Sequence, residues 1–76
     1  MRVYKIFTDA GPESEWFSGD NKEYLSSWAK DESDAKLFTS LETAENYLRT
    51  GRHRIFTTAR WVYAEIVAYD LVKVED

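Results

Sequence analysis

Long apolar and polar side chains alternate from residue 2 to residue 8, where β-branched and aromatic types are frequent. This combination predicts a first β-strand over 2–8. Gly11 and Pro12 follow, and both residue types favour a turn. A second short strand is expected over 15–18, so the chain opens with two strands joined by a tight connection.

A hairpin is predicted next, because Gly19, Asp20 and Asn21 tolerate the backbone conformations of a tight turn. Extended character resumes over 24–28 and ends at a tryptophan. Residues 30–34 are polar and form a connector. Residues 35–38 then bring the chain back to the core as a short strand or a turn.

A helix is predicted from Ser40 to about Thr50. The segment 39–42 fits a capping box, in which the Thr39 hydroxyl accepts a hydrogen bond from the backbone of Glu42 and the glutamate reaches back. Spacings of three and four residues place four apolar side chains on one helix face: Leu41, Ala44, Tyr47 and Leu48. Gly51 is expected to end the helix in a left-handed conformation.

The run from Ala59 to Val74 alternates as one long strand with two largely apolar faces. One face would carry Trp61, Tyr63, Val67, Tyr69 and Leu71, and the other Val62, Ala64, Ile66, Ala68, Val72 and Val74. A strand that is apolar on both faces is usually central in its sheet or covered on both sides. We expect the face with Ala64 and Ala68 to lie under the helix, because small residues allow close approach.

These elements predict an α+β fold in one domain, residues 1–76, with the order β-β-β-α-β. An antiparallel sheet of three or four strands would carry one helix on one face. One helix covers one face only, so Trp61, Tyr63 and Tyr69 are expected on a face that the helix leaves bare. Aromatic side chains on a bare sheet face are typical of an interface, although connectors or a strongly coiled sheet could bury them.

Several positions also resemble a known group of proteins: the hairpin ending in Trp28, residues 35–38, the cap at 39–40 and residues 44–48. This pattern is similar to small uncharacterised α+β proteins encoded by bacteriophages and prophages. The resemblance implies a phage or mobile-element origin, where such proteins commonly bind a host or viral protein. It transfers no functional residue, because the matching positions are core and capping residues.

Composition limits the chemistry that the chain can carry. The 76 residues contain no cysteine, which excludes disulfides, thiolate metal sites and cysteine nucleophiles. At this size only about 60% of the unfolded surface is buried on folding, so the core is thin. The sequence has no apolar run long enough to cross a bilayer and no signal-peptide core, so we expect a cytoplasmic protein without membrane contact.

We expect no enzyme activity, cofactor or metal. His53 is the only histidine, and neither Ser26 nor Ser27 lies in a strained nucleophile turn. The acids at 31, 32 and 34 lack the ligand spacing of a calcium loop. The three glycines are isolated, so no phosphate-binding loop is present.

The formal net charge is −4, and it is distributed unevenly. Acids dominate from Asp9 to Asp34, and nucleic-acid mimicry is one use of such a stretch. Five basic residues and no acid occupy 49–60: Arg49, Arg52, His53, Arg54 and Arg60. Arginine can grip phosphate or carboxylate at two points, but basic residues also stabilise the C-terminal end of a helix.

The leading hypothesis is a non-catalytic protein-binding module, a phage-encoded modulator or inhibitor of a host or viral protein. The candidate contact residues are Trp61, Tyr63 and Tyr69 together with Arg49, Arg52, His53, Arg54 and Arg60. A weak nucleic-acid-binding protein that uses the basic segment is the alternative, and its affinity would fall steeply with salt. A small homodimeric structural protein is the third reading.

Overall fold

The computed structural model describes residues 1–11, 13–20, 26–55 and 57–70. Its elements follow one another as β1 (Arg2–Thr8), β2 (Glu15–Asp20), β3 (Ser26–Ala29), the short 3-10 helix η1 (Glu32–Asp34), α1 (Leu41–Arg52), α2 (Ala59–Val62) and β4 (Glu65–Asp70). The α+β class and the β-β-β-α-β order are confirmed. The short helices η1 and α2 are additions that the sequence pattern did not predict.

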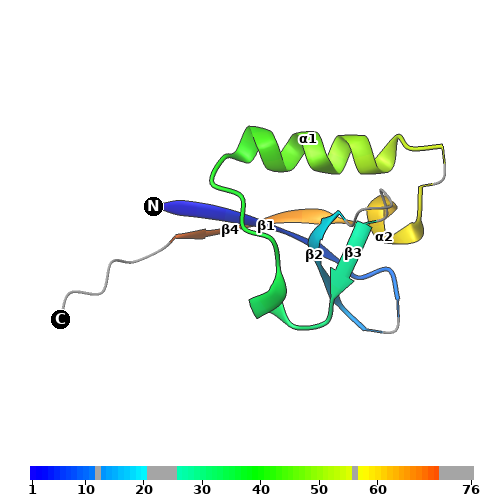
Figure 1. The fold of residues 1–76 in the computed structure, drawn as a ribbon, viewed down its shortest axis with the longest axis horizontal. Helices are drawn as coiled ribbons and strands as arrows, with labels where there is room; N and C mark the ends of the chain where they lie inside the picture. Colours follow the sequence, from blue (N-terminus) through cyan, green and yellow to red (C-terminus); the bar gives the residue numbers. More distant parts are fainter. Residues whose placement is uncertain (12, 21–25, 56, 71–76) are drawn as a thin grey trace.

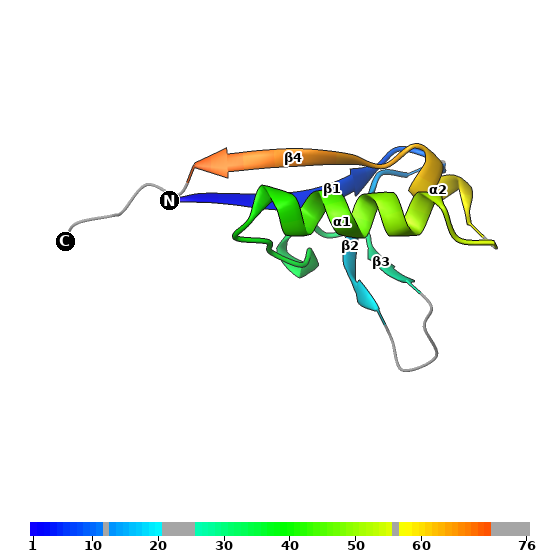
Figure 2. The ribbon, with the colours of Figure 1, turned by 90° about the horizontal axis from the view of Figure 1, so that it is seen from above.

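All strand pairs are antiparallel, and the sheet has the order β3-β2-β1-β4. β1 pairs with β4 along six residues, but with β2 only at Phe7–Trp16 and Thr8–Glu15. Beyond that point β2 and β3 turn away and run crosswise to β1 and β4 (Figure 2). The segment before α1 fills the place beside β1, where Tyr4 and Phe38 exchange backbone hydrogen bonds of 2.8 and 2.9 Å.

The predicted hairpin strands are present with shifted bounds. β2 extends two residues beyond the expected end, and its pairing with β3 shifts register between Phe17 and Gly19. Gly19 has φ 126°, a conformation that glycine adopts without steric cost. β3 begins at Ser26, and the part of the expected turn and strand at 21–25 lies outside the described residues.

Helix α1 begins one residue later than predicted. Ser40, not Thr39, is the N-cap, and its side-chain oxygen accepts a hydrogen bond of 3.4 Å from the backbone N–H of Thr43. Ala44, Tyr47 and Leu48 pack on the core as expected, whereas Leu41 is 44% exposed. The predicted helix face is therefore right over its last two turns.

Gly51 does not end the helix, which continues to Arg52 with His53 as C-cap. The glycine is buried within α1, and the indole ring of Trp61 lies directly on it. A Cβ at this position would overlap the ring, at 2.6 Å from Cε2. Glycine is required here because the ring needs the space, and the predicted left-handed stop is wrong.

The predicted strand 59–74 is wrong over its first part. Residues 59–62 form α2, which turns the Trp61 side chain into the core, and β4 begins only at Glu65. Residues 71–74 lie outside the described residues. β4 is also an edge strand rather than a central one, because β1 occupies the centre of the sheet.

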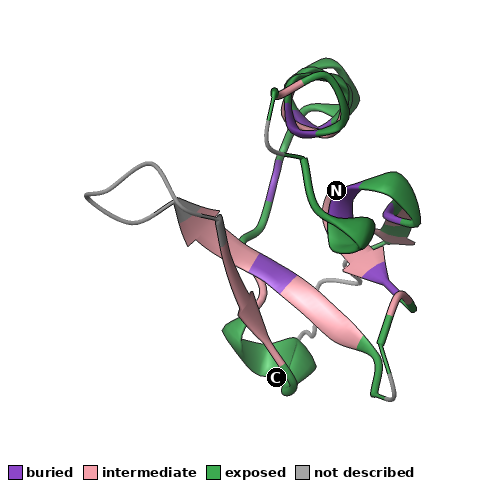
Figure 3. Cartoon of the chain, turned by 90° about the vertical axis from the view of Figure 1, so that its right-hand side faces the viewer, coloured by how far each residue is buried: buried purple, intermediate pink, exposed green. Residues whose placement is uncertain are grey.

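The two faces of the sheet are covered unequally. α1 lies along one side, and η1 with its connector lies on the other (Figure 1). Seen end on, α1 turns its buried residues toward the sheet (Figure 3). The buried hydrophobic cluster lies beneath α1 and consists of Ile6, Phe17, Phe38, Ala44, Trp61 and Ala64.

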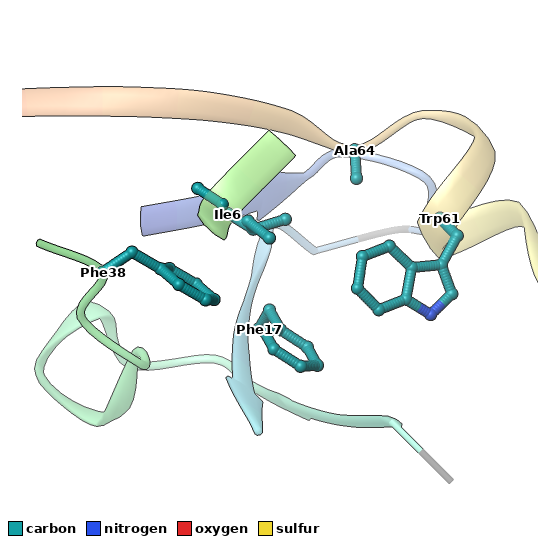
Figure 4. Close-up of a cluster of buried hydrophobic side chains, with 6 residues drawn as sticks. Ile6, Phe17, Phe38, Trp61 and Ala64 are labelled. Atoms are coloured by element: carbon teal, nitrogen blue, oxygen red, sulfur yellow. The ribbon is translucent and has the colours of Figure 1, made fainter. Parts of the chain in front are cut away.

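Phe17 lies at the centre of this cluster, between Phe38 and Trp61 (Figure 4). Its ring centroid is 5.1 Å from that of Trp61 and 5.6 Å from that of Trp28, and Trp28 meets Trp61 edge to face at 5.1 Å. Such tilted arrangements suit the charge distribution of aromatic rings. The rings join α1, α2 and the β2–β3 pair into one core.

We predict that Gly51→Ala destabilises the protein, although alanine is the better helix former by about 1 kcal/mol. The added methyl group would push the Trp61 ring off α1, and such overpacking costs about 1 to 3 kcal/mol. Thr43→Ala, at an exposed position of the same helix, is the control and should be neutral or stabilising. Urea unfolding of both variants measures the difference, and a more stable Gly51→Ala protein would contradict the packing.

Candidate functional site

The three aromatic residues predicted to share one bare face do not share it. Trp61 is 2% exposed and lies in the core under α1, because α2 breaks the alternation that the sequence suggested. Tyr63 is the C-cap of α2, outside the strands, and is 67% exposed. Only Tyr69 lies on the sheet face opposite α1, so the predicted face is wrong for Trp61 and Tyr63.

The bare side of the sheet is formed instead by neighbours of Tyr69 on β1 and β2. We name it the open face and define it as Lys5, Phe7, Trp16, Val67 and Tyr69, all partly exposed. The registers Lys5–Val67 and Phe7–Trp16 place these residues side by side. The rings of Phe7 and Trp16 are 5.0 Å apart between centroids, so the face has a contiguous aromatic centre.

Lys5 lies in the middle of the open face. Its Nζ is 5.0 Å from the Tyr69 ring centroid and 5.8 Å from that of Trp16, within the range of cation–π attraction. The same ammonium group donates to the Glu32 carboxylate at 3.2 Å, and only 16% of the Lys5 side chain is exposed. Lys5 therefore ties η1 to the sheet.

Glu32 and Tyr69 complete this contact. A hydrogen bond from the Tyr69 hydroxyl, followed by that from Lys5, holds the pKa of the Glu32 carboxyl below its ordinary value. Burial, and then the hydrogen bond to Glu32, raises the pKa of Tyr69 to about 12. At neutral pH the carboxylate is ionised and the phenol protonated, so neither group is poised to exchange protons.

The open face therefore offers a contact surface with fixed charges rather than an acid–base pair. Among the described residues no cluster of three histidines or acids could hold a metal ion. Lys5, Phe7 and Trp16 were not selected from the sequence. The alternation in 2–8 does place Lys5 and Phe7 on one strand face, but the sequence did not show that β1 lies beside β4.

The basic segment is divided among different contacts. Arg52 donates to the backbone carbonyls of Trp61 and Ala64, at 3.3 and 2.6 Å, and so stabilises the end of α2. Arg60 pairs with Glu15 at 2.8 Å. Arg52 is thus held against α2 and Arg60 against β2.

The other three basic residues lie along or just after α1. Arg49 donates to Asn46 at 2.7 Å, and His53 is the exposed C-cap of the helix. Arg54 is half-buried and borders a shallow hollow of about 280 Å³ with Asn46, Tyr47 and Thr50. Nucleic-acid binding by this segment stays a prediction.

A second hollow, of about 260 Å³, is lined by four charged residues: Glu13, Glu15, Lys30 and Arg60. They form two ion pairs, Lys30–Glu13 at 2.9 Å and Arg60–Glu15 at 2.8 Å. The positive and negative charges balance within the hollow. It therefore presents no net charge to attract a charged ligand.

Comparisons with family models, curated proteins and solved structures found no match to the chain. Within the described ranges, the helices are too short or too polar to span a lipid bilayer.

We predict that Arg52 has a structural role. Arg52→Ala should lower the free energy of unfolding by about 1 to 2 kcal/mol, because two carbonyl groups near the end of α2 lose a charged donor. Arg49→Ala, on the same helix, should change it by less than about 0.5 kcal/mol. Thermal unfolding of the two variants provides the comparison, and equal effects would show that the Arg52 contacts are not specific.

We also predict an acid-sensitive contact at Glu32. Because folding lowers the Glu32 pKa, its contribution to stability is complete above the ordinary value of 4.5 and is lost as pH falls through the lower folded value. Glu32→Gln should therefore be less stable than wild type at pH 7, with the difference vanishing in acid. The Tyr69 pKa should also fall from about 12 toward 10, because the anionic acceptor has gone.

Urea unfolding at several pH values, with NMR titration of the Tyr69 ring, measures both effects. Asp34→Asn on the same 3-10 turn is the control, since Asp34 makes no contact with Lys5 or Tyr69 among those the structure shows. The same pH dependence in both variants would refute a specific role for Glu32.

Proposed function

We propose that the chain is a non-catalytic protein-binding module and that the open face is its contact surface. The observation that carries the proposal is the unequal covering of the sheet. α1 buries Ile6 and Phe17 on one face, whereas η1 leaves Phe7, Trp16 and Val67 partly exposed on the other. A contiguous group of partly exposed aromatic and aliphatic side chains favours a partner contact.

The composition of the open face supports the same reading. Aromatic side chains are enriched at the centres of protein interfaces, and unpaired charges are depleted there. The Lys5 charge is already balanced by Glu32 and by two aromatic rings. A partner could therefore cover this face without burying an uncompensated charge, which would otherwise oppose binding.

We favour a chain that modulates or inhibits a larger host or viral protein. The support for this choice is the resemblance of the sequence to small phage and prophage proteins. The homodimer and the nucleic-acid reading make different predictions. A homodimer would show a mass that depends on concentration, and phosphate contacts would show a steep dependence of affinity on salt.

We expect Val67→Glu to weaken partner binding. The substitution places a carboxylate in the middle of the open face, next to Lys5, and should weaken binding by about tenfold or more. Tyr63→Ser is the matched control, because Tyr63 is exposed at the C-cap of α2 and is not part of the open face. Near-ultraviolet circular dichroism checks that both variants keep the packing of the three tryptophans.

Affinity capture from a lysate of the source organism, with quantitative mass spectrometry, compares wild type with both variants. A protein retained by wild type and by Tyr63→Ser, but lost with Val67→Glu, supports the proposal. Sedimentation at several concentrations runs in parallel. Equal capture of every lysate protein by wild type and both variants would refute a different protein as partner on this face. So would a self-association that Val67→Glu abolishes while the captured proteins stay the same.

A further inference from the structure

The outer edge of β4 is available for pairing. β4 stands at the end of the strand order and pairs with β1 along all six of its residues, Glu65–Asp70. Within the described part of the chain no strand pairs with its other edge. A six-residue edge of this kind can template the addition of another strand.

The register shows which backbone groups point outward. Tyr4 directs both its N–H and its C=O to Phe38, away from β4, so its pairing with Ala68 carries no hydrogen bonds. Ala68 must then direct its own N–H and C=O away from β1. By the alternation of an antiparallel ladder, Ile66 and Asp70 do the same.

β4 lacks the features that commonly protect an edge strand. It contains no proline or lysine, its pairing with β1 has no bulge, and its centre Ile66–Tyr69 is apolar and rich in strand formers. β3, at the other edge of the sheet, has only four residues and a register irregularity against β2. The β4 edge is therefore the better suited of the two to accept a strand.

The charges at β4 indicate what the added strand would carry. Asp70 is paired with Arg2 at 3.0 Å, whereas Glu65 is exposed and makes no ion pair among the described residues. β4 contains no basic residue, so a second copy of this strand would bring only acidic side chains to an edge that already carries Glu65 and Asp70, and like charges on paired strands destabilise a sheet. A basic side chain opposite Glu65 would be favoured instead.

We propose that β4 accepts an extended segment of a partner protein, held by backbone hydrogen bonds to Ile66 and Ala68. The segment carries lysine or arginine opposite Glu65 and apolar side chains beside Val67 and Tyr69, so that it extends the open face by one strand. The inference rests on the proposed function and adds the chemistry and the binding mode of the partner.

A random 12-residue peptide library displayed on phage, selected against the full chain, tests this proposal. We expect peptides with alternating apolar residues and a lysine or arginine at one position. Selection against the Glu65→Lys protein should yield aspartate or glutamate at that peptide position, because the charge on the edge is reversed. Selected peptides without a basic position, or unchanged by Glu65→Lys, would overturn the proposal.

Ala68→Pro tests the backbone contact with one selected peptide, made synthetically. Proline removes only an outward N–H and is tolerated on edge strands, so the fold should persist while peptide affinity falls by about tenfold or more. Val67→Pro is the contrast, since it removes an N–H directed at β1 and should unfold the chain. Undiminished peptide binding to a folded Ala68→Pro protein would overturn strand addition. Hydrogen exchange of the wild-type protein would also overturn it, if the bound peptide slowed the exchange of no outward-facing amide of β4.

The two proposals fail in different ways. A lysate partner lost with Val67→Glu but retained by Ala68→Pro and Glu65→Lys leaves the open face as the contact surface and overturns strand addition. A partner retained by all three variants overturns both. If sedimentation shows a dimer that Ala68→Pro abolishes, the strand paired with β4 belongs to a second copy of the chain. That result would refute a partner segment that carries lysine or arginine.

Discussion

The contact between the Trp61 ring and the bare backbone of Gly51 is the constraint on which the rest of the fold depends. It brings α2 against the C-terminal part of α1 and places the indole beside Phe17 and Trp28. Arg52 donates to the Trp61 carbonyl, and the Thr57 hydroxyl donates to that of Gly51 at 2.7 Å. In a chain without disulfides, this contact and its hydrogen bonds hold the helices against the β2–β3 pair.

The position of α1 determines what remains open on the other side. All the large buried rings gather under the helix, so the opposite face receives only η1 and its connector. Lys5 fastens η1 to this face, because it pairs with Glu32 and lies against two aromatic rings of the sheet. The result is a face with internally balanced charge and aromatic residues that are still partly exposed, and it continues directly into the edge of β4.

Local patterns predicted the elements whose residues interact with near neighbours. The strand 2–8, the hairpin strands and the helix were found because alternation, turn residues and a cap are readable over a few positions. The run from Ala59 failed for the same reason. Trp61 and Tyr63 favour strands intrinsically, but α2 is stabilised by contacts from far along the chain: Arg52 donates to carbonyls near its end, and the Trp61 ring packs on the bare backbone of Gly51.

The sequence by itself determined the fold class, the order of elements and the side-chain alternation that places Lys5 and Phe7 together. Tertiary structure alone decided that β1 lies between β2 and β4, that Trp61 is buried, and that Trp16 joins Tyr69 on the open face. The physical reason is range. Periodicity records which side chains share a face of one element, whereas strand order and burial depend on contacts between residues far apart in the chain.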